Sequence, residues 1–511
     1  MTFRFSGLIF KRGVISLLIP ALLNAPLVVA PAFAQPMGAP TLGPASASDL
    51  SPGLERKLGE AIMEQGRRDP DYIQDPDVSQ YLNRMARKLA ANAPGGAPEI
   101  EAFGVRDSTI NAFAMPGGFI GVHTGLIVSA GTEAELAGVM AHEIAHVTQR
   151  HIARGLTQQS QSGHIALASI AAALMAAFIP GGGANLAAGL AAFGQAAAIE
   201  QQLGFSRDAE QEADRTGFEM LRKAGYDPNG MAVMFGRLMK ASNLNEGRGG
   251  GVYASTHPLS IQRMTDMQNR LRQFPQTRYQ ASDEFWFVRA RARVLQATDP
   301  KSLRLAIDAM EEEALVASRE SGSLAGVRQA ASWYGISLAQ AALKDHAASV
   351  KSFARAQGLV TSSPFIELQK IDLDIAGKNI PAAYASAAAA NKRWPDRRSF
   401  ALRVAQTLQL MGKDREAATF LKEQIKRWPT DEPVLYQMLA NSLEKTGDQV
   451  AARRQMARYY ELMGALPAAV TQLQQARTLS TDFYEQSQID VDVRQLSQKL
   501  VDNRRQLEKF K

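Results

Sequence analysis

Apolar side chains recur at every third or fourth position over two stretches near the start of the chain, Leu54 to Arg67 and Val78 to Ala91. This period is typical of amphipathic helices with one buried face. A Ser-Pro pair at 51–52 and an Asp-Pro pair at 75–76 precede the stretches, and each combines a capping side chain with a proline suited to the first helical turn. We therefore expect ordered structure to begin near Ser51 with two helices.

The period changes between positions 99 and 123. Two short strand-like runs, Glu99 to Val105 and Ile110 to Ala114, are followed by a Met-Pro-Gly-Gly turn at 115–118 and a third run, Phe119 to His123. Short apolar runs joined by a tight turn predict a small antiparallel sheet among the helices.

Beyond about Asp283 the pattern becomes one of Ala-, Leu- and Gln-rich helices that recur at a fixed interval. Trp394-Pro395 is repeated as Trp428-Pro429, 34 residues later. A helix-turn-helix period of that length is typical of tetratricopeptide repeats, whose units bury their apolar faces by stacking on one another. We expect about four units from Val327 to Met463 with capping helices after them. The concave surface of such a solenoid predicts binding of peptides or proteins.

The composition agrees with two folded units. A chain of 511 residues exceeds the roughly 250–300 residues at which single hydrophobic cores stop growing. We place the first unit at 51–275 and the second at 283–511, and expect a mostly α fold. The 46% of hydrophobic and 21% of charged residues exclude a wholly disordered chain and a polytopic membrane protein. The net charge is only +7 without a dense basic run, so nucleic acid is not an expected partner.

The first 34 residues have the three parts of a secretory signal peptide. Basic residues are followed by an apolar run from Val14 to Ala30 and by Ala32-Phe33-Ala34, so we expect cleavage after Ala34. Residues 35–50 are rich in Pro, Gly and Ala and form the expected flexible lead-in. The chain has no Cys, which argues against both a lipid anchor on cysteine and disulfides.

Two segments of the first unit have an unusual composition. An Ala- and Gly-rich apolar stretch runs from Ile165 to Ile199 and is broken by Pro-Gly-Gly-Gly at 180–183. Each half is short for a transmembrane span, so we expect a helical hairpin near the active site or resting peripherally on a membrane surface. The polar, Gly-containing segment from Ser242 to Thr256 predicts a mobile loop.

The candidate chemistry lies in His142-Glu143-Ile144-Ala145-His146. Thr132 and Glu135 form a capping box that opens the helix carrying this motif, which we expect to reach about Arg154. Histidines four residues apart share one helical face and can bind a single Zn²⁺ per chain. Zinc would supply the Lewis acid for peptide hydrolysis, and Glu143 would be the general base that passes a proton to the leaving amine.

A catalytic zinc needs a third protein ligand. The metzincin arrangement would require Gly at 149 and His at 152, where Gln and Ile stand, and His151 is one residue out of register. A later acidic helix offers Glu210 and Asp214 on one face, whereas Glu212 would point elsewhere. One of the first two can bind zinc while the other accepts the second N–H of a ligand histidine.

Together these motifs resemble the BepA-like periplasmic zinc metalloproteases. The resemblance rests on the H-E-x-x-H helix, the S-R-x-x-E-x-E-A-D helix at 206–214, the Asn-Ala-Phe-Ala strand at 111–114, the Ser-Thr-His-Pro motif at 255–258 and the repeats. It covers essentially the whole mature chain. It implies a gluzincin fold in which His142, His146 and Glu210 bind zinc and Asp214 supports a ligand. It also implies a periplasmic role in quality control of outer-membrane protein assembly, with unfolded or stalled outer-membrane proteins and their assembly machinery as partners.

Two further site residues are expected beside the zinc. The strand at Asn111 and Ala112 would hold an extended polypeptide substrate through backbone hydrogen bonds, unless Asn111 is only a polar turn residue. His257 resembles the plug histidine of the same family, which would fill the fourth zinc position at rest. The alternative for His257 is a loop residue that stabilises substrate or caps the next helix.

Two other classes of function compete with the enzyme. The first is a chaperone or interaction protein that works through its repeats while its zinc site is silent, structural or self-inhibited. The second is a zinc-free helical scaffold. The presence of every catalytic group favours the zinc metalloendopeptidase.

Overall fold

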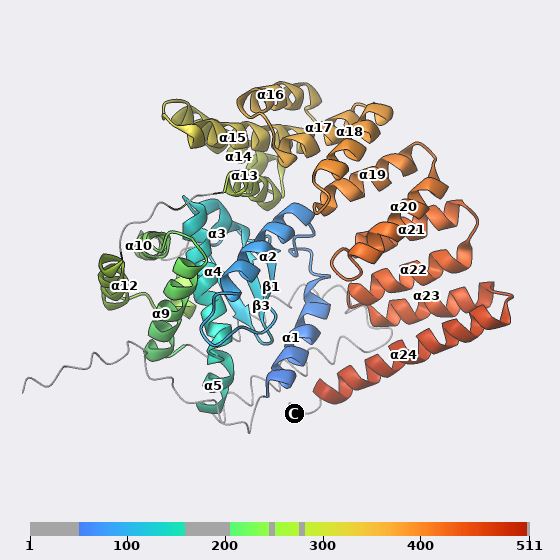
Figure 1. Ribbon diagram of the computed structural model, residues 1–511, viewed down its shortest axis with the longest axis horizontal. Helices are drawn as coiled ribbons and strands as arrows, with labels where there is room; N and C mark the ends of the chain where they lie inside the picture. The colour runs from blue at the N-terminus through green and yellow to red at the C-terminus, as the bar shows by residue number, and fades with distance from the viewer. Residues whose placement is uncertain (1–50, 159–204, 245–250, 275–278, 280–281, 508–511) are drawn as a thin grey trace, which may run out of the picture. The chain divides into compact units, whose positions relative to one another are not determined.

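The computed structural model describes residues 51–158, 205–244, 251–274, 279 and 282–507. The predicted signal peptide at 1–34, the lead-in at 35–50 and the apolar stretch at 165–199 lie outside these residues, as do positions 245–250 of the predicted loop. Positions 242–244 and 251–256 of that loop are helical, so the loop prediction is wrong at both ends. In the part of the chain that the structure describes, no helix has both the length and the hydrophobicity needed to cross a membrane. Figure 1 shows the elements with the labels used below.

Two capped helices open the described chain, as the pattern predicted. The side chain of Ser51 accepts a hydrogen bond from the backbone N–H of Leu54, and Asp75 accepts one from Val78. Each helix also has a proline in its first turn, where no N–H is needed. The helices are α1 (Pro52–Gly66) and α2 (Pro76–Ala90).

The sheet is mixed, so the prediction of a wholly antiparallel sheet is wrong for one of its two pairings. β2 (Ala112–Met115) and β3 (Phe119–His123) form the predicted antiparallel hairpin, whereas β1 (Glu101–Val105) runs parallel to β3 on its other side. Within the described residues the strand order is β1-β3-β2. All five residues of β3 are buried, as expected of a central strand. The prediction failed because hydrophobic alternation alone does not specify which strands are neighbours or in which direction they run.

The helix that carries the H-E-x-x-H motif is shorter than predicted. α4 (Glu133–Thr148) ends before the expected position, and a separate helix, α5 (His151–Gln158), follows. The break falls at Arg150, whose φ of 54° lies in the left-handed region and cannot belong to a right-handed helix. Neither Gly nor Pro marks this position, so the sequence pattern gave no sign of the break.

Further helices complete the first half and surround α4. The Cβ that a side chain would add at Gly217, on α9, would lie only 3.0 Å from the backbone oxygen of Ala141, so glycine allows α9 to pack closely on α4. Figure 1 shows these two helices side by side. The helices are α3 (Thr124–Ser129), α9 (Arg207–Lys223), α10 (Asn229–Leu244), α11 (Gly251–Thr256) and α12 (Ile261–Gln273).

The second half is a succession of helix-turn-helix pairs, which confirms the mostly α fold with a C-terminal helical solenoid. α17 begins at Pro364 and α19 at Arg398, a spacing of 34 residues that matches the predicted repeat. Trp394 and Trp428 occupy equivalent C-cap positions of α18 and α20. The helices are α13 (Glu284–Gln296), α14 (Pro300–Ser318), α15 (Ser323–Ala342), α16 (His346–Leu359), α17 (Pro364–Ala376), α18 (Ile380–Arg393), α19 (Arg398–Leu410), α20 (Asp414–Arg427), α21 (Val434–Lys445), α22 (Gln449–Leu462), α23 (Leu466–Leu479) and α24 (Phe483–Leu507).

The largest hydrophobic cluster of the described residues extends from Ile73 to Ile366 and so includes side chains on both sides of position 283. A buried ion pair of 2.6 Å between Arg291 and Asp75 also joins α13 to the start of α2. The first repeat helices thus share a core with the N-terminal half. The domain boundary placed between 275 and 283 stays a prediction.

Candidate metal centre

Helix α4 presents the two motif histidines on one buried face. Its start is fixed by Thr132, whose side chain accepts a hydrogen bond from the backbone N–H of Glu135. His142, Glu143 and His146 are each completely buried, and the Nε2 atoms of the two histidines lie 3.0 Å apart. Both imidazoles therefore direct a nitrogen to the same point, with the Glu143 side chain between them in sequence.

Helix α9 brings a carboxylate to this point. Ser206 caps the helix, and Glu210 in its first turn is 1% exposed. The two carboxylate oxygens of Glu210 lie 3.4 Å from Nε2 of His142 and 3.4 Å from Nε2 of His146. Burial alone would raise the pKa of Glu210. The charge of His257 and the hydrogen bonds of the surrounding imidazoles outweigh burial and hold that pKa well below its usual range.

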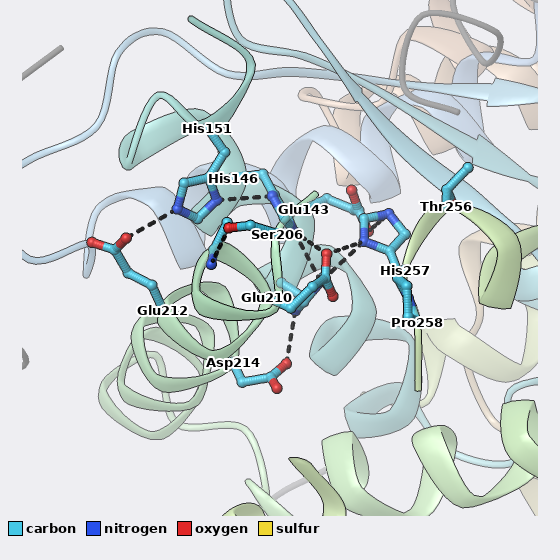
Figure 2. A network of polar contacts seen from close by, with 12 residues as sticks. Glu143, His146, His151, Ser206, Glu210, Glu212, Asp214, Thr256, His257 and Pro258 are labelled. Atoms are coloured by element: carbon cyan, nitrogen blue, oxygen red, sulfur yellow. Dashed lines mark hydrogen bonds and ion pairs between the residues drawn. The ribbon is translucent and has the colours of Figure 1, made fainter. Parts of the chain in front are cut away.

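His257, directly after α11, completes the group. Its Nδ1 lies 2.9 Å from a Glu210 oxygen and 3.4 Å from Nε2 of His142. Its ring is stacked between Tyr253, at 4.6 Å between centroids, and Phe205, at 5.6 Å. Figure 2 shows His257, Glu210 and His146 converging from three separate segments of the chain. The sequence-predicted ligands and the predicted plug histidine are thus brought together.

The four side chains fit a single zinc ion. One ligand atom from each of His142, His146, Glu210 and His257 lies within 4.8 Å of all the others. Tetrahedral zinc with bonds of about 2.0–2.1 Å requires ligand atoms roughly 3.3 Å apart. Nε2 of His142 lies 3.0 Å from His146 and 3.4 Å from His257, and Oε1 of Glu210 lies 2.9 Å from His257 and 3.4 Å from His146, close to that spacing. Imidazole nitrogen and carboxylate oxygen are also the donors that zinc prefers. Burial lowers the pKa of His146 well below its usual range, so its ring is neutral and able to donate a lone pair.

Asp214 and Arg263 support this group from outside. Asp214 lies one turn after Glu210 on α9, and its Oδ1 is 3.0 Å from Nδ1 of His142. Arg263 on α12 holds both Asp214 oxygens through two hydrogen bonds of 2.7 Å and lies 2.6 Å from Glu210. Burial disfavours the Arg263 charge, but the two carboxylates outweigh burial and raise its pKa. Sequence reasoning found Asp214 but not Arg263, because no motif or periodicity links α12 to the site.

We expect Arg263→Met to destabilise the folded protein by about 3–5 kcal/mol, because it leaves two buried carboxylates without their arginine partner. Arg270→Met is the matched control, since Arg270 lies on the same helix but forms only a partly exposed i,i+4 pair with Asp266. Such pairs contribute less than about 1 kcal/mol. Urea unfolding of both variants measures the difference, and equal free energies of unfolding would refute a structural role for Arg263.

Tyr253 is a second residue that the sequence did not reveal. It is completely buried on α11, and its hydroxyl donates a 3.4 Å hydrogen bond to Oε1 of Glu143. Burial raises the pKa of Tyr253 well above its ordinary value, so the phenol keeps its proton. Nε2 of His257 lies 3.5 Å from the same Glu143 oxygen. The segment that carries both rings thus contacts the predicted general base as well as the candidate metal ligands.

The predicted substrate-binding residues lie on the edge of the sheet. Among the described strands, β2 pairs only with β3. Asn111 immediately precedes β2, and the backbone oxygen of Asn111 accepts a 3.0 Å hydrogen bond from the N–H of His123. The Asn111 side chain is 1% exposed, and neither its nitrogen nor its oxygen has a hydrogen-bond partner among the described residues. A buried amide without hydrogen-bond partners lowers the stability of the folded protein. The Asn111 side chain is therefore suited to form hydrogen bonds with a bound ligand. Ala112 is completely buried.

Comparisons with known proteins agree with the site. The model of Peptidase family M48 matches residues 73–271. A Vibrio cholerae protein is 38% identical over 272 residues, which cover 51% of this chain and 53% of that protein. The Beta-barrel assembly-enhancing protease of Escherichia coli is 34% identical over 284 residues, covering 55% of this chain and 56% of the relative. The chain thus spans about half the length of these two relatives.

A shorter relative is covered more completely. Metalloprotease LoiP of Escherichia coli is 31% identical over 200 residues, which make up 38% of this chain and 73% of that protein. Among solved structures, the TPR domain of P58(IPK) covers 74% of this chain and 96% of its own at 12% identity, with a TM-score of 0.16. That score supports no argument, so the repeat assignment rests on the helix pairs themselves.

Proposed function

Because this chain belongs to peptidase family M48, we propose that it is a zinc-dependent endopeptidase whose ligands are His142, His146 and Glu210. The observation that supports this most strongly is the convergence of these ligand atoms, within 4.8 Å of one another, beside the buried carboxylate of Glu143. Family membership also argues against the zinc-free scaffold.

Each protein group has a separate task in peptide hydrolysis. Zinc, when bound, supplies a Lewis acid that polarises the scissile carbonyl and makes water more acidic. Glu143 accepts the proton of the attacking water and returns it to the leaving amine. Oδ1 of Asp214 lies 3.0 Å from Nδ1 of His142, which favours the proton on that nitrogen and leaves the Nε2 lone pair of the ring directed at the ligand group.

We propose that this arrangement is the closed, resting state of the site. His257 supplies a fourth ligand atom, and Tyr253 and His257 both contact Glu143, the group that must reach water. Glu143, Tyr253 and His257 are all completely buried, so neither substrate nor bulk water can reach the base. We propose that α11 and His257 move away together to activate the enzyme.

The substrate that suits this site is an extended, unfolded polypeptide. Strand β2 offers an edge for backbone pairing, and the Asn111 amide is available to bind a substrate peptide group. All four residues of β2 are buried here, so strand addition also requires the site to open. Backbone pairing tolerates many side chains, which suits a quality-control enzyme acting on diverse unfolded chains.

The names of the relatives suggest where this activity is used. Two relatives are described as beta-barrel assembly-enhancing proteases, which supports a role in the assembly of β-barrel proteins. Together with the family resemblance of the motifs, this leads us to propose outer-membrane β-barrel proteins as substrates and the periplasm as location. The helix pairs from α15 to α22 would bind the substrates or their assembly machinery. The buried active site favours one alternative, a chaperone-like interaction protein whose protease is largely self-inhibited.

We expect the full-length protein to cleave an unfolded outer-membrane β-barrel protein and to spare the same protein once it is folded in detergent. A zinc chelator should stop cleavage, and one equivalent of zinc should restore it, because the ligand group fits one ion. Gel analysis of both substrate forms measures this. Cleavage that is unaffected by the chelator would contradict the proposal, whereas binding without cleavage would favour the chaperone-like alternative.

A further inference from the structure

His151 is brought to the zinc ligands by an unusual feature of the backbone. It follows His146 by five residues, so a continuous helix would turn it well away from the face that carries the ligands. Instead α4 stops, and Arg150 takes a φ of 54° that few residues other than Gly, Asn or Asp adopt. Residues held in such a conformation cluster at functional sites. This break in the helix places Nδ1 of His151 2.9 Å from Nδ1 of His146.

The other side of the His151 ring is held by a carboxylate. His151 is 2% exposed, and its Nε2 lies 3.2 Å from an oxygen of Glu212. Arg154, one turn along α5, donates a 2.6 Å hydrogen bond to the same oxygen. Figure 2 shows this line of contacts from Glu212 through His151 to His146. Glu212, which sequence reasoning left without a role, therefore points to His151 and not to the metal.

The positions of the protons follow from these contacts. A carboxylate can only accept, so His151 donates from Nε2 to Glu212. A neutral imidazole that donates from Nε2 has a lone pair on Nδ1. His146 must then carry its own proton on Nδ1, because one of two nitrogens 2.9 Å apart has to donate. The remaining lone pair of His146 lies on Nε2, the atom that meets the other ligand atoms.

We propose that His151 is a positioning residue for the zinc ligand His146, and that Glu212 and Arg154 act through it. This inference rests on the proposed zinc site. His142 and His146 are thus supported in different ways. The first faces the carboxylate of Asp214 directly, whereas the second reaches Glu212 only through a neutral ring.

Two substitutions of His151 separate hydrogen bonding from packing. His151→Phe keeps the ring but cannot accept a hydrogen bond, whereas His151→Asn is smaller and places its carbonyl oxygen where Nδ1 now accepts. We expect the Phe variant to lose about 10- to 100-fold in zinc affinity, and the Asn variant to lose clearly less. The measurement is competition for zinc between the full-length protein and a chelator of known affinity. Thermal unfolding of the zinc-free proteins checks that both variants fold.

A double-mutant cycle with Glu212→Ala provides the second test. If Glu212 acts through His151, its removal weakens zinc binding in the wild type but not in His151→Phe. Equal zinc affinity of wild type and His151→Phe would overturn the proposal, as would a larger loss in His151→Asn than in His151→Phe. A wild-type protein that binds no zinc would instead refute the proposed function, so the two failures are distinguishable. If His151→Phe does not fold, the same double-mutant cycle is measured with His151→Asn. Additive losses of zinc affinity from His151→Asn and Glu212→Ala would then contradict the proposal that Glu212 acts through His151.

Discussion

Glu143→Gln is expected to reduce peptide cleavage by about a thousandfold or more while the protein keeps its zinc, because general-base catalysis contributes about 10²–10⁴-fold. The amide is nearly isosteric with the carboxylate, but it cannot take a proton from water. Glu143 does not belong to the group of four ligand atoms, so the metal should stay bound. Cleavage of unfolded polypeptide and zinc content are measured on the same preparation.

Three variants give this test its controls. Glu219→Gln makes the same chemical change on α9 at a partly exposed ion pair and should leave both cleavage and zinc unchanged. His146→Ala and Glu210→Ala each remove a proposed ligand and should lose both. Cleavage by Glu143→Gln at the wild-type rate would refute the general-base assignment.

His257→Ala is expected to raise basal cleavage about tenfold or more with zinc retained, if the closed site is the dominant resting population. Three protein ligands remain, and three ligands with one open position are typical of catalytic zinc. The substitution also removes the ring packed between Tyr253 and Phe205, which favours release of α11 from Glu143. Initial rates on unfolded substrate, compared at equal zinc content, measure the effect.

His346→Ala is the matched control, because His346 is exposed on α16 and should not affect the rate. Tyr253→Phe removes only the hydrogen bond to Glu143 and keeps the ring beside His257, so we expect a smaller rise in rate. A loss of activity in His257→Ala with zinc retained would contradict self-inhibition. It would show that His257 stabilises the transition state.

The candidate metal-binding group could be predicted because each of its parts lies within a short, regular segment. His142 and His146 share a face of one helix, and Glu210 and Asp214 share a face of another, so helical periodicity is enough to pair them. The resemblance to a known family added His257. The match to Peptidase family M48 confirms that resemblance, and the structure confirms the mostly α fold.

The residues that were missed depend on tertiary contacts that no local pattern encodes. Arg263 and Tyr253 reach the site from α12 and α11, which follow α4 by more than a hundred residues. His151 was set aside because it stands one residue out of the metzincin register, and the left-handed backbone at Arg150 that brings it to His146 leaves no mark in the sequence. The parallel pairing of β1 with β3 is likewise not specified by the alternation of apolar and polar residues in the sequence.

The most direct test of the zinc site is an anomalous difference map from crystals of the full-length protein, recorded on both sides of the zinc absorption edge. We expect one peak per chain that appears only above the edge, within bonding distance of His142 Nε2, His146 Nε2 and Glu210, with Nδ1 of His257 as the fourth neighbour. A map without a zinc peak at this position, or with a peak elsewhere in the chain, would contradict the central claim.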